Sequence, residues 1–135
     1  MQNFEQISNH VQGHYKITAR DSYLVCVELS LEQGQRHQSI FLSELDGEDE
    51  RKYLRVSTAV APVTGLDARR MLAFNWHRRV GHLAIGELDS VPYLQLCENR
   101  PYDTLTPSEI DRMILEIGGL GDNLERMLSA GGDLL

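Results

Sequence analysis

Hydrophobic residues alternate with polar ones along much of the first half of the chain, and such alternation predicts β-strands. Residues 14–21 (HYKITARD) show it clearly, and residues 22–31 (SYLVCVELSL) carry apolar residues on both faces, as is typical of a central strand. Residues 37–45 and 51–63 continue the pattern. The connections are too short for crossover helices, so this half predicts a meander of about four antiparallel strands.

Elsewhere the apolar residues recur every three or four positions, which predicts helices. The first helix is short, begins near Phe4 and ends at Gly13. The second begins at Leu66 or Asp67, where an aspartate can cap the first turn, and Gly81 ends it. Its apolar stripe, which we expect to be a packing face, comprises Met71, Leu72, Ala73 and Trp76.

The third helix has the clearest start signal, because Thr106 and Glu109 form a capping box with a proline at the first helical position. Three glycines, Gly118, Gly119 and Gly121, interrupt its apolar face. Each glycine costs about 0.5–1 kcal/mol relative to alanine in a helix interior, so we expect a kink or a close approach to another element. The tail that follows, residues 129–135, is expected to fray.

Two short strands, residues 82–88 and 91–97, separate the second and third helices, with a hairpin turn at Asp89 and Ser90. The element order is then helix, four strands, helix, two strands, helix. Helices that are segregated from an antiparallel sheet define the α+β class, with a twisted antiparallel sheet and helices packed on it. At 135 residues, we expect a single domain that spans residues 1–135.

The chain is acidic, with a net charge of −7, and its acidic residues are spread along the sequence. Because phosphate neutralisation needs a clustered basic face, we expect neither nucleic acid nor an anionic membrane as a partner. The charge fits both a soluble protein of the cytoplasm and a binder of basic partners. The N-terminal residues lack a signal-peptide pattern, and no apolar run reaches the length of a membrane span, so we expect a cytoplasmic protein.

The sequence carries no catalytic signature. Cys26 and Cys97 lie within apolar strand-like runs, which favours buried free thiols over a disulfide or a nucleophile. His10 and His14 have a helical spacing, but Gly13 lies between them and the glutamate of a metalloprotease motif is absent. No nucleophile elbow or phosphate-binding loop occurs. We therefore expect no enzyme, and we assign no catalytic, cofactor-binding or metal-binding residues.

Residues 77–82 (HRRVGH) concentrate basic side chains in an acidic chain. Cationic residues near a helix C-terminus interact favourably with the helix dipole and the free carbonyl groups, which explains the patch without any ligand. The alternative is a small-molecule or anion-binding domain, in which two arginines and two histidines of the His77–His82 patch hold a phosphate or carboxylate. Trp76, just before this patch, also has two interpretations, namely core packing of the second helix and a place in an interface.

Several stretches together resemble the type III secretion chaperone-like fold, including its YbjN-like branch. These are QSIFL at residues 38–42, LRVSTAVAPV at residues 54–63, a helix with Asn75 near its end, Gly81 before a strand pair, and a last helix that closes in DNLERML at residues 122–128. The resemblance implies a small acidic α+β protein that is usually a homodimer, has no cofactor and binds an unidentified protein partner, such as a secreted effector in the chaperone branch.

The resemblance also implies where the interfaces lie. In the secretion chaperones the second helix and the strand after it often form the dimer interface. Carried over to this chain, the dimer-interface candidates are Leu72, Trp76, Leu83 and Ile85. The candidates for partner contact are apolar strand residues, although alternation does not say which face of the sheet is covered. They are Tyr23, Val25, Val27 and Phe41.

Overall fold

The computed structural model describes residues 1–129, and within this range three α-helices accompany one six-stranded β-sheet. The element bounds are α1 Phe4–Gln12, β1 Lys16–Arg20, β2 Leu24–Leu31, β3 Arg36–Asp46, β4 Lys52–Pro62, α2 Ala68–His77, β5 His82–Leu88, β6 Val91–Pro101 and α3 Pro107–Ser129. The predicted class and element order are confirmed. The predicted fraying of the tail concerns mostly residues 130–135, which lie outside the described residues. No helix within residues 1–129 combines the length and apolarity needed to cross a membrane.

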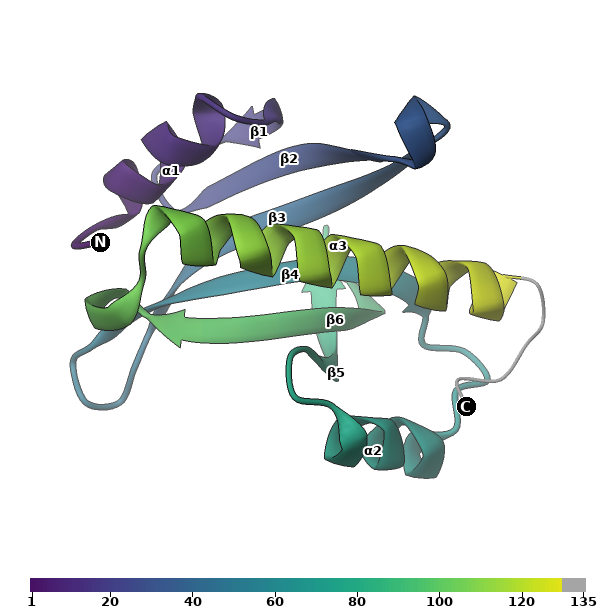
Figure 1. Cartoon of the computed structure of the whole chain (residues 1–135). Coiled ribbons are helices and arrows are strands. Elements are labelled where there is room, and N and C mark those ends of the chain that lie inside the picture. The colour runs from purple at the N-terminus through teal and green to yellow at the C-terminus, as the bar shows by residue number, and fades with distance from the viewer. Residues whose placement is uncertain (130–135) are drawn as a thin grey trace.

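The sheet is antiparallel throughout, with the strand order β1-β2-β3-β4-β6-β5. β6 pairs with β4, so β5 lies at one edge of the sheet. Figure 1 shows α3 lying lengthwise across one side of the sheet, with α1 beside its N-terminal end and α2 near β5. In the described part of the chain, the opposite side of strands β2, β3, β4 and β6 has no helix packed on it. We call this side the helix-free face.

The core lies between the sheet and the helices α1 and α3. Val25 and Val27 of β2 and Ile40 and Leu42 of β3 are fully buried on the helix-covered face. Since successive strand residues point to opposite faces, the intervening residues point to the helix-free face. The registers align one residue from each of five strands on that face, in the row Cys26, Phe41, Ser57, Cys97 and His82.

The glycines of α3 allow a close approach to the sheet, and the helix runs without interruption from Pro107 to Ser129. A Cβ atom added at Gly118 would lie 2.4 Å from Cδ2 of Leu29, and one added at Gly121 would lie 2.3 Å from Cγ2 of Thr58. Of the two expected explanations, close approach is correct, since these positions leave no room for a side chain.

The second helix differs from the prediction in two respects. It ends at His77, and Gly81 lies beyond it, with a φ of +84° in the turn that leads into β5. The expected packing stripe is also wrong for three of its four residues, since Met71 packs against the core whereas Leu72, Ala73 and Trp76 are exposed. Phe74 is the buried residue of α2, whereas Leu72 and Trp76 point to solvent. Leu72 and Trp76 are four residues apart and share one side of the helix, and Phe74, two residues from each, lies on the other.

Candidate functional site

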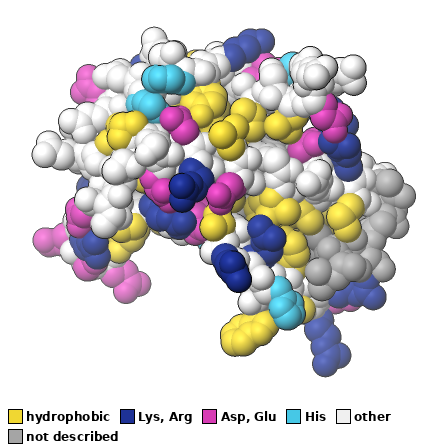
Figure 2. Space-filling model, in the orientation of Figure 1, with side chains coloured by type: hydrophobic (Ala, Val, Ile, Leu, Met, Phe, Trp, Pro, Cys, Tyr) yellow, Lys and Arg dark blue, Asp and Glu magenta, His cyan; other side chains and the backbone are white. Residues whose placement is uncertain are grey.

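Three large apolar side chains are exposed on two neighbouring elements, α2 and β5. Leu72 is 69% exposed, Trp76 83% and Ile85 61%, and we call these three residues the α2–β5 surface. Figure 2 shows a hydrophobic side chain projecting at the bottom of the view, beside a histidine and Lys or Arg side chains. Three of the four dimer-interface candidates are therefore accessible to a partner.

Leu83, the fourth candidate, is not part of this surface. It is only 6% exposed, lies opposite Leu96 in the β5–β6 pair and belongs to the hydrophobic core. Sequence alternation places Leu83 and Ile85 on the same face of β5, but the core covers only the first of them. We therefore remove Leu83 from the candidate interface.

The α2–β5 surface is held in place by Asn75, which joins the helix to the strand. Its side-chain amide donates to the carbonyl oxygen of Leu83 at 3.1 Å and accepts from the Leu83 backbone N–H at 2.6 Å. Next to it, Phe74 is buried and the guanidinium of Arg78 lies 5.8 Å from its ring centroid. Because α2 is anchored in this way, Leu72 and Trp76 keep a fixed orientation relative to β5.

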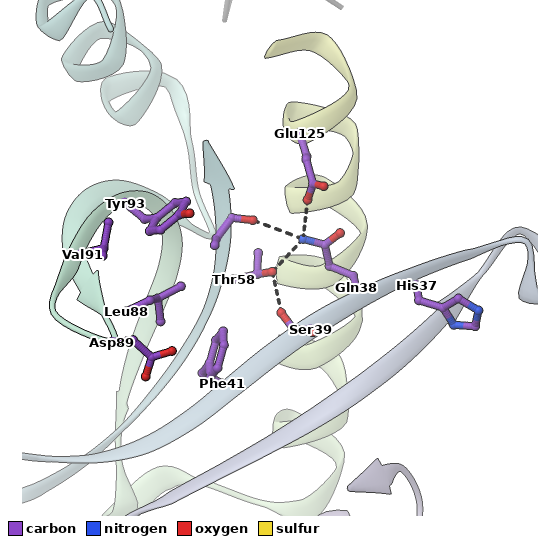
Figure 3. Close-up of a pocket in the computed structure, with 11 residues that line it drawn as sticks. His37, Gln38, Ser39, Phe41, Thr58, Leu88, Asp89, Val91, Tyr93 and Glu125 are labelled. Carbon is purple, nitrogen blue, oxygen red and sulfur yellow. Dashed lines mark hydrogen bonds between the residues drawn. The ribbon is translucent and has the colours of Figure 1, made fainter. Parts of the chain in front are cut away.

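The helix-free face contains a series of adjoining hollows. The first has a volume of about 540 Å³ and the second about 430 Å³, and Phe41, Leu88 and Asp89 line both. A third, of about 150 Å³, shares four lining residues with the second. Figure 3 shows how the β5–β6 hairpin, with Leu88, Val91 and Tyr93, forms one wall of the first hollow, opposite Gln38 and His37. The result is a groove between the hairpin and β3.

Only one of the four candidates for partner contact lies in this groove. Phe41 lines the first two hollows, and Tyr23, although 67% exposed, lines none of the three. Val25 and Val27 are fully buried in the core, so they offer no surface to a partner and we remove them from the site. The reason is the direction of the side chains of β2, whose alternate residues Val25 and Val27 point to the helix-covered side.

A buried polar network closes the groove where it meets the C-terminal half of α3. The Gln38 amide donates to Oγ1 of Thr58 at 2.8 Å and to Oε2 of Glu125 at 3.2 Å, and the Thr58 hydroxyl donates to the carbonyl oxygen of Ser39 at 2.7 Å (Figure 3). Gln38 is 4% exposed and Thr58 is fully buried. These bonds fix the side chains at this end of the groove, a role that the sequence pattern did not indicate.

The cysteines lie where the sequence places them, since Cys26 and Cys97 are both buried and free. Cys97 Sγ lies 3.4 Å from Nε2 of His82, which is the arrangement of a thiol with a neighbouring base. However, burial raises the pKa of the Cys97 thiol, whereas nucleophilic cysteines have a lowered pKa. The pair is therefore poorly suited to nucleophilic chemistry near neutral pH.

The basic patch His77–His82 does not converge on one ligand. Arg78 packs over Phe74 and donates to the carbonyl oxygen of Val80 at 3.4 Å, while His82 points to the helix-free face beside Cys97. His77 lies in the last turn of α2, where a cation interacts favourably with the helix dipole. The geometry thus fits the interpretation of the patch as the end of a helix better than that of an anion site.

Both N-terminal histidines make polar contacts, and that of His10 joins α1 to α3. His10 Nε2 lies 3.0 Å from a carboxylate oxygen of Asp111, and His14 Nδ1 donates to the carbonyl oxygen of His10 at 2.7 Å. Among residues 1–129, no group of three or more His, Cys, Asp or Glu side chains is arranged to hold a metal ion.

Comparison with known proteins gives a clear result for the fold alone. The sequence matches no protein-family model and no curated protein sequence. The structure, in contrast, matches the type III secretion chaperones SchA and ExsC. The match to the HopA1–SchA chaperone–effector complex covers 91% of this chain and 93% of the matched chain, at 12% identity and a TM-score of 0.61. The match to the ExsC–ExsE complex covers 95% and 97%, at 18% identity and a TM-score of 0.63.

Proposed function

We propose that this protein is a non-catalytic, chaperone-like binding protein that acts as a homodimer on a protein partner. The observation that carries the proposal is the pair of accessible apolar features on this fold, namely the α2–β5 surface and the groove that contains Phe41. The match to a chaperone in complex with its effector supports a partner of the same class, a protein destined for secretion.

We assign the α2–β5 surface to a second copy of the chain. It adjoins β5, an edge strand of the described sheet, and an exposed apolar edge is a site where chains associate. Because Asn75 occupies the backbone N–H and carbonyl of Leu83, we assign the contact to the exposed side chains and not to strand pairing at Leu83. A two-fold axis can bring the same patch on both copies together, as in most homodimers. Light scattering on the purified protein should then give about twice the chain mass of 15.3 kDa.

We assign the groove on the helix-free face to the protein partner. Its hollows adjoin one another, and their lining contains apolar side chains such as Phe41 and Leu88 as well as polar ones. An extended segment of a partner suits such a groove, because alternate side chains of an extended chain can enter successive hollows.

A selection experiment tests this assignment. A library of random peptides displayed on phage is selected against the wild-type protein, and the selected peptides are tested against Phe41→Ser and Tyr23→Ser. Both variants remove an aromatic ring, but only Phe41 lines the groove. We expect Phe41→Ser to weaken binding at least tenfold, as is usual for a central aromatic contact, and Tyr23→Ser to leave it nearly unchanged.

Three results would contradict the proposal. The first is a failure to select any peptide on the wild-type protein. The second is a set of peptides that bind Phe41→Ser as tightly as wild type. The third is a loss of binding with Tyr23→Ser alone, which would place the partner outside the groove.

A further inference from the structure

Arg55 is a partly buried cation without an ion-pair partner among residues 1–129. It lies on the helix-free face of β4, and its Nε donates to the side-chain oxygen of Asn99 at 3.2 Å. In a chain with 20 acidic residues, other partly buried arginines, such as Arg36 and Arg100, contact carboxylates. Placing a charge in a partly desolvated site is costly unless an opposite charge compensates for it. Arg55 is therefore suited to an external carboxylate.

Two neighbouring polar side chains are also without a partner. Ser57 is 6% exposed and Gln95 is 8% exposed, and neither side chain makes a hydrogen bond within the described part of the chain. Both line the second and third hollows of the groove, together with Arg55. Ser8 Oγ is the only fully buried unpaired side-chain polar atom among residues 1–129, so the polar atoms of Ser57 and Gln95 are open to the hollow, where water or a ligand can bond to them. They are therefore available to a ligand that enters this hollow.

The three groups form one polar floor. Arg55 and Ser57 are two residues apart on β4 and therefore point to the same side of the sheet, and Gln95 lies on β6 opposite Ala59. The Nε2 atom of Gln95 lies against Gly86, where an added Cβ atom would be only 3.0 Å from it. The absence of a side chain at Gly86 leaves the amide room to face the hollow.

The chemistry of this floor matches a carboxylate. The guanidinium can donate two parallel hydrogen bonds to one carboxylate, and the Ser57 hydroxyl and Gln95 amide can donate to its oxygens or to an adjacent peptide group. Glu87 and Asp89 line the same hollow and repel any anion there, but they repel a doubly charged phosphate more strongly than a singly charged carboxylate. Leu24 and Phe41 add an apolar wall, which a free anion would not use.

We propose that the groove binds an extended protein segment that carries an Asp or Glu side chain, with its carboxylate on Arg55, Ser57 and Gln95 and an apolar neighbour against Phe41. This inference rests on the proposed function, because it specifies the chemistry of the partner segment. The proposal therefore predicts an acidic side chain at one position of the partner segment, although the net charge of −7 alone would favour a basic partner.

The test compares peptides selected on two versions of the full chain. The phage library is selected against wild type and against Arg55→Met, which keeps a long apolar side chain but removes the charge. On wild type we expect peptides with Asp or Glu close to an apolar residue. On Arg55→Met the preference for Asp or Glu should disappear while the preference for the apolar residue remains. Circular dichroism establishes that both proteins are folded.

A double-mutant cycle then measures the pairing directly. One selected peptide and its twin, with Gln in place of Glu or Asn in place of Asp, are titrated against both proteins. We expect the twin to bind wild type roughly tenfold more weakly or worse, as for a close charge pair, and to bind Arg55→Met as tightly as the parent peptide. Arg55→Lys keeps the charge without the planar fork and should give an intermediate value.

The outcomes separate this inference from the proposed function. Peptides that show no preference for Asp or Glu, or a twin that binds wild type as tightly as its parent, would overturn the inference and leave partner binding intact. A failure to select peptides on wild type would overturn both. Titration with sodium acetate and sodium phosphate, followed by NMR at the Arg55 Nε–H, distinguishes a free anion. If acetate or phosphate, at the concentration at which the peptide binds, changes the chemical shift of the Arg55 Nε–H, a free anion is sufficient and the requirement for a protein segment is overturned.

Discussion

At the scale of single residues, Asp122 on α3 is the only buried Asp, Glu, Lys or Arg side chain among residues 1–129. Its carboxylate is buried and accepts hydrogen bonds from Arg36 Nε at 2.9 Å and from an Arg126 terminal nitrogen at 2.8 Å. The hydrogen bond from Arg36 is the largest cause that holds the pKa of this carboxyl below its ordinary value of 3.8. A lowered pKa means that the folded state favours the ionised form.

The sign of this effect sets a pH dependence. Because the folded-state pKa is below the unfolded value, Asp122 stabilises the fold above about pH 4 and loses this contribution as the pH falls further. We expect Asp122→Asn to lower the free energy of unfolding by about 1–3 kcal/mol at pH 7, and the difference from wild type to shrink towards pH 2. Urea unfolding at several pH values measures it.

The matched control for this prediction is Asp103→Asn. Asp103 pairs with Arg51 at 3.1 Å, but its side chain is 67% exposed, so the expected change is small at every pH. An Asp122→Asn variant that is as stable as wild type at pH 7, or equally destabilised at all pH values, would contradict the proposed role.

At the scale of elements, the glycines of α3 determine how closely the helix lies on the sheet. Gly119 has no atom within 4 Å of an added Cβ, whereas Gly121 faces the fully buried Thr58. Thr58 cannot easily move, because it is β-branched and its hydroxyl takes part in two hydrogen bonds, to Ser39 and from Gln38. Replacing glycine with alanine is therefore expected to have opposite effects on stability at positions 119 and 121 of this helix.

We expect Gly119→Ala to raise the free energy of unfolding by about 0.5–1 kcal/mol, because alanine restricts the unfolded chain and favours the helix. Gly121→Ala should lower it by about 1–3 kcal/mol, because its Cβ would overlap the Thr58 methyl group. Chemical denaturation of both variants provides the measurement. A Gly121→Ala variant at least as stable as wild type would show that the spacing between α3 and β4 is not set by Gly121.

The starts of α2 and α3 and the strand runs could be predicted from the sequence because they depend on local periodicity and capping, whereas α2 ends at His77, before the predicted Gly81. Asp67 caps α2, with its side chain accepting from the Arg69 N–H at 3.0 Å, and the Thr106 hydroxyl accepts from the Glu109 N–H at 3.2 Å. The buried side of α2 could not be predicted. Leu72 and Trp76 form as good an apolar stripe as any core face, and only contact with β5 shows that Phe74 is the buried residue.

The candidate site was predictable only in part, for a related reason. Val25 and Phe41 both lie on alternating apolar strands, and which of them is accessible depends on the face that α3 covers. That is decided by packing between residues far apart in the sequence. Likewise, Ser57 and Gln95 read as ordinary strand residues, and their lack of hydrogen-bond partners becomes apparent only when β4 and β6 are placed side by side.

At the scale of the whole molecule, the strand order places the apolar surface at the edge of the sheet. β6 lies between β4 and β5, so β5 has a neighbour on one side alone in the described structure, and α2 is anchored to it through Asn75. The groove lies on the helix-free face, away from Leu72 and Trp76. Leu72 and Trp76 line none of the three hollows, so a dimer contact through these two residues would leave the first and second hollows available. Ile85 belongs to the α2–β5 surface and also lines the third hollow, so the two proposed interfaces adjoin there.

Trp76 is the only tryptophan in the chain, so its fluorescence reports on this surface directly. On dilution of the protein we expect the emission to shift to longer wavelength and quenching by acrylamide to increase, as the side chain moves from an interface to water. Leu72→Ser should weaken the dimer at least tenfold. Leu115→Ser, which changes an exposed leucine of α3, should not. Because Leu72 and Trp76 are exposed in the single chain, neither result depends on unfolding. A constant emission across dilutions in which light scattering records dissociation would place the dimer contact on another surface.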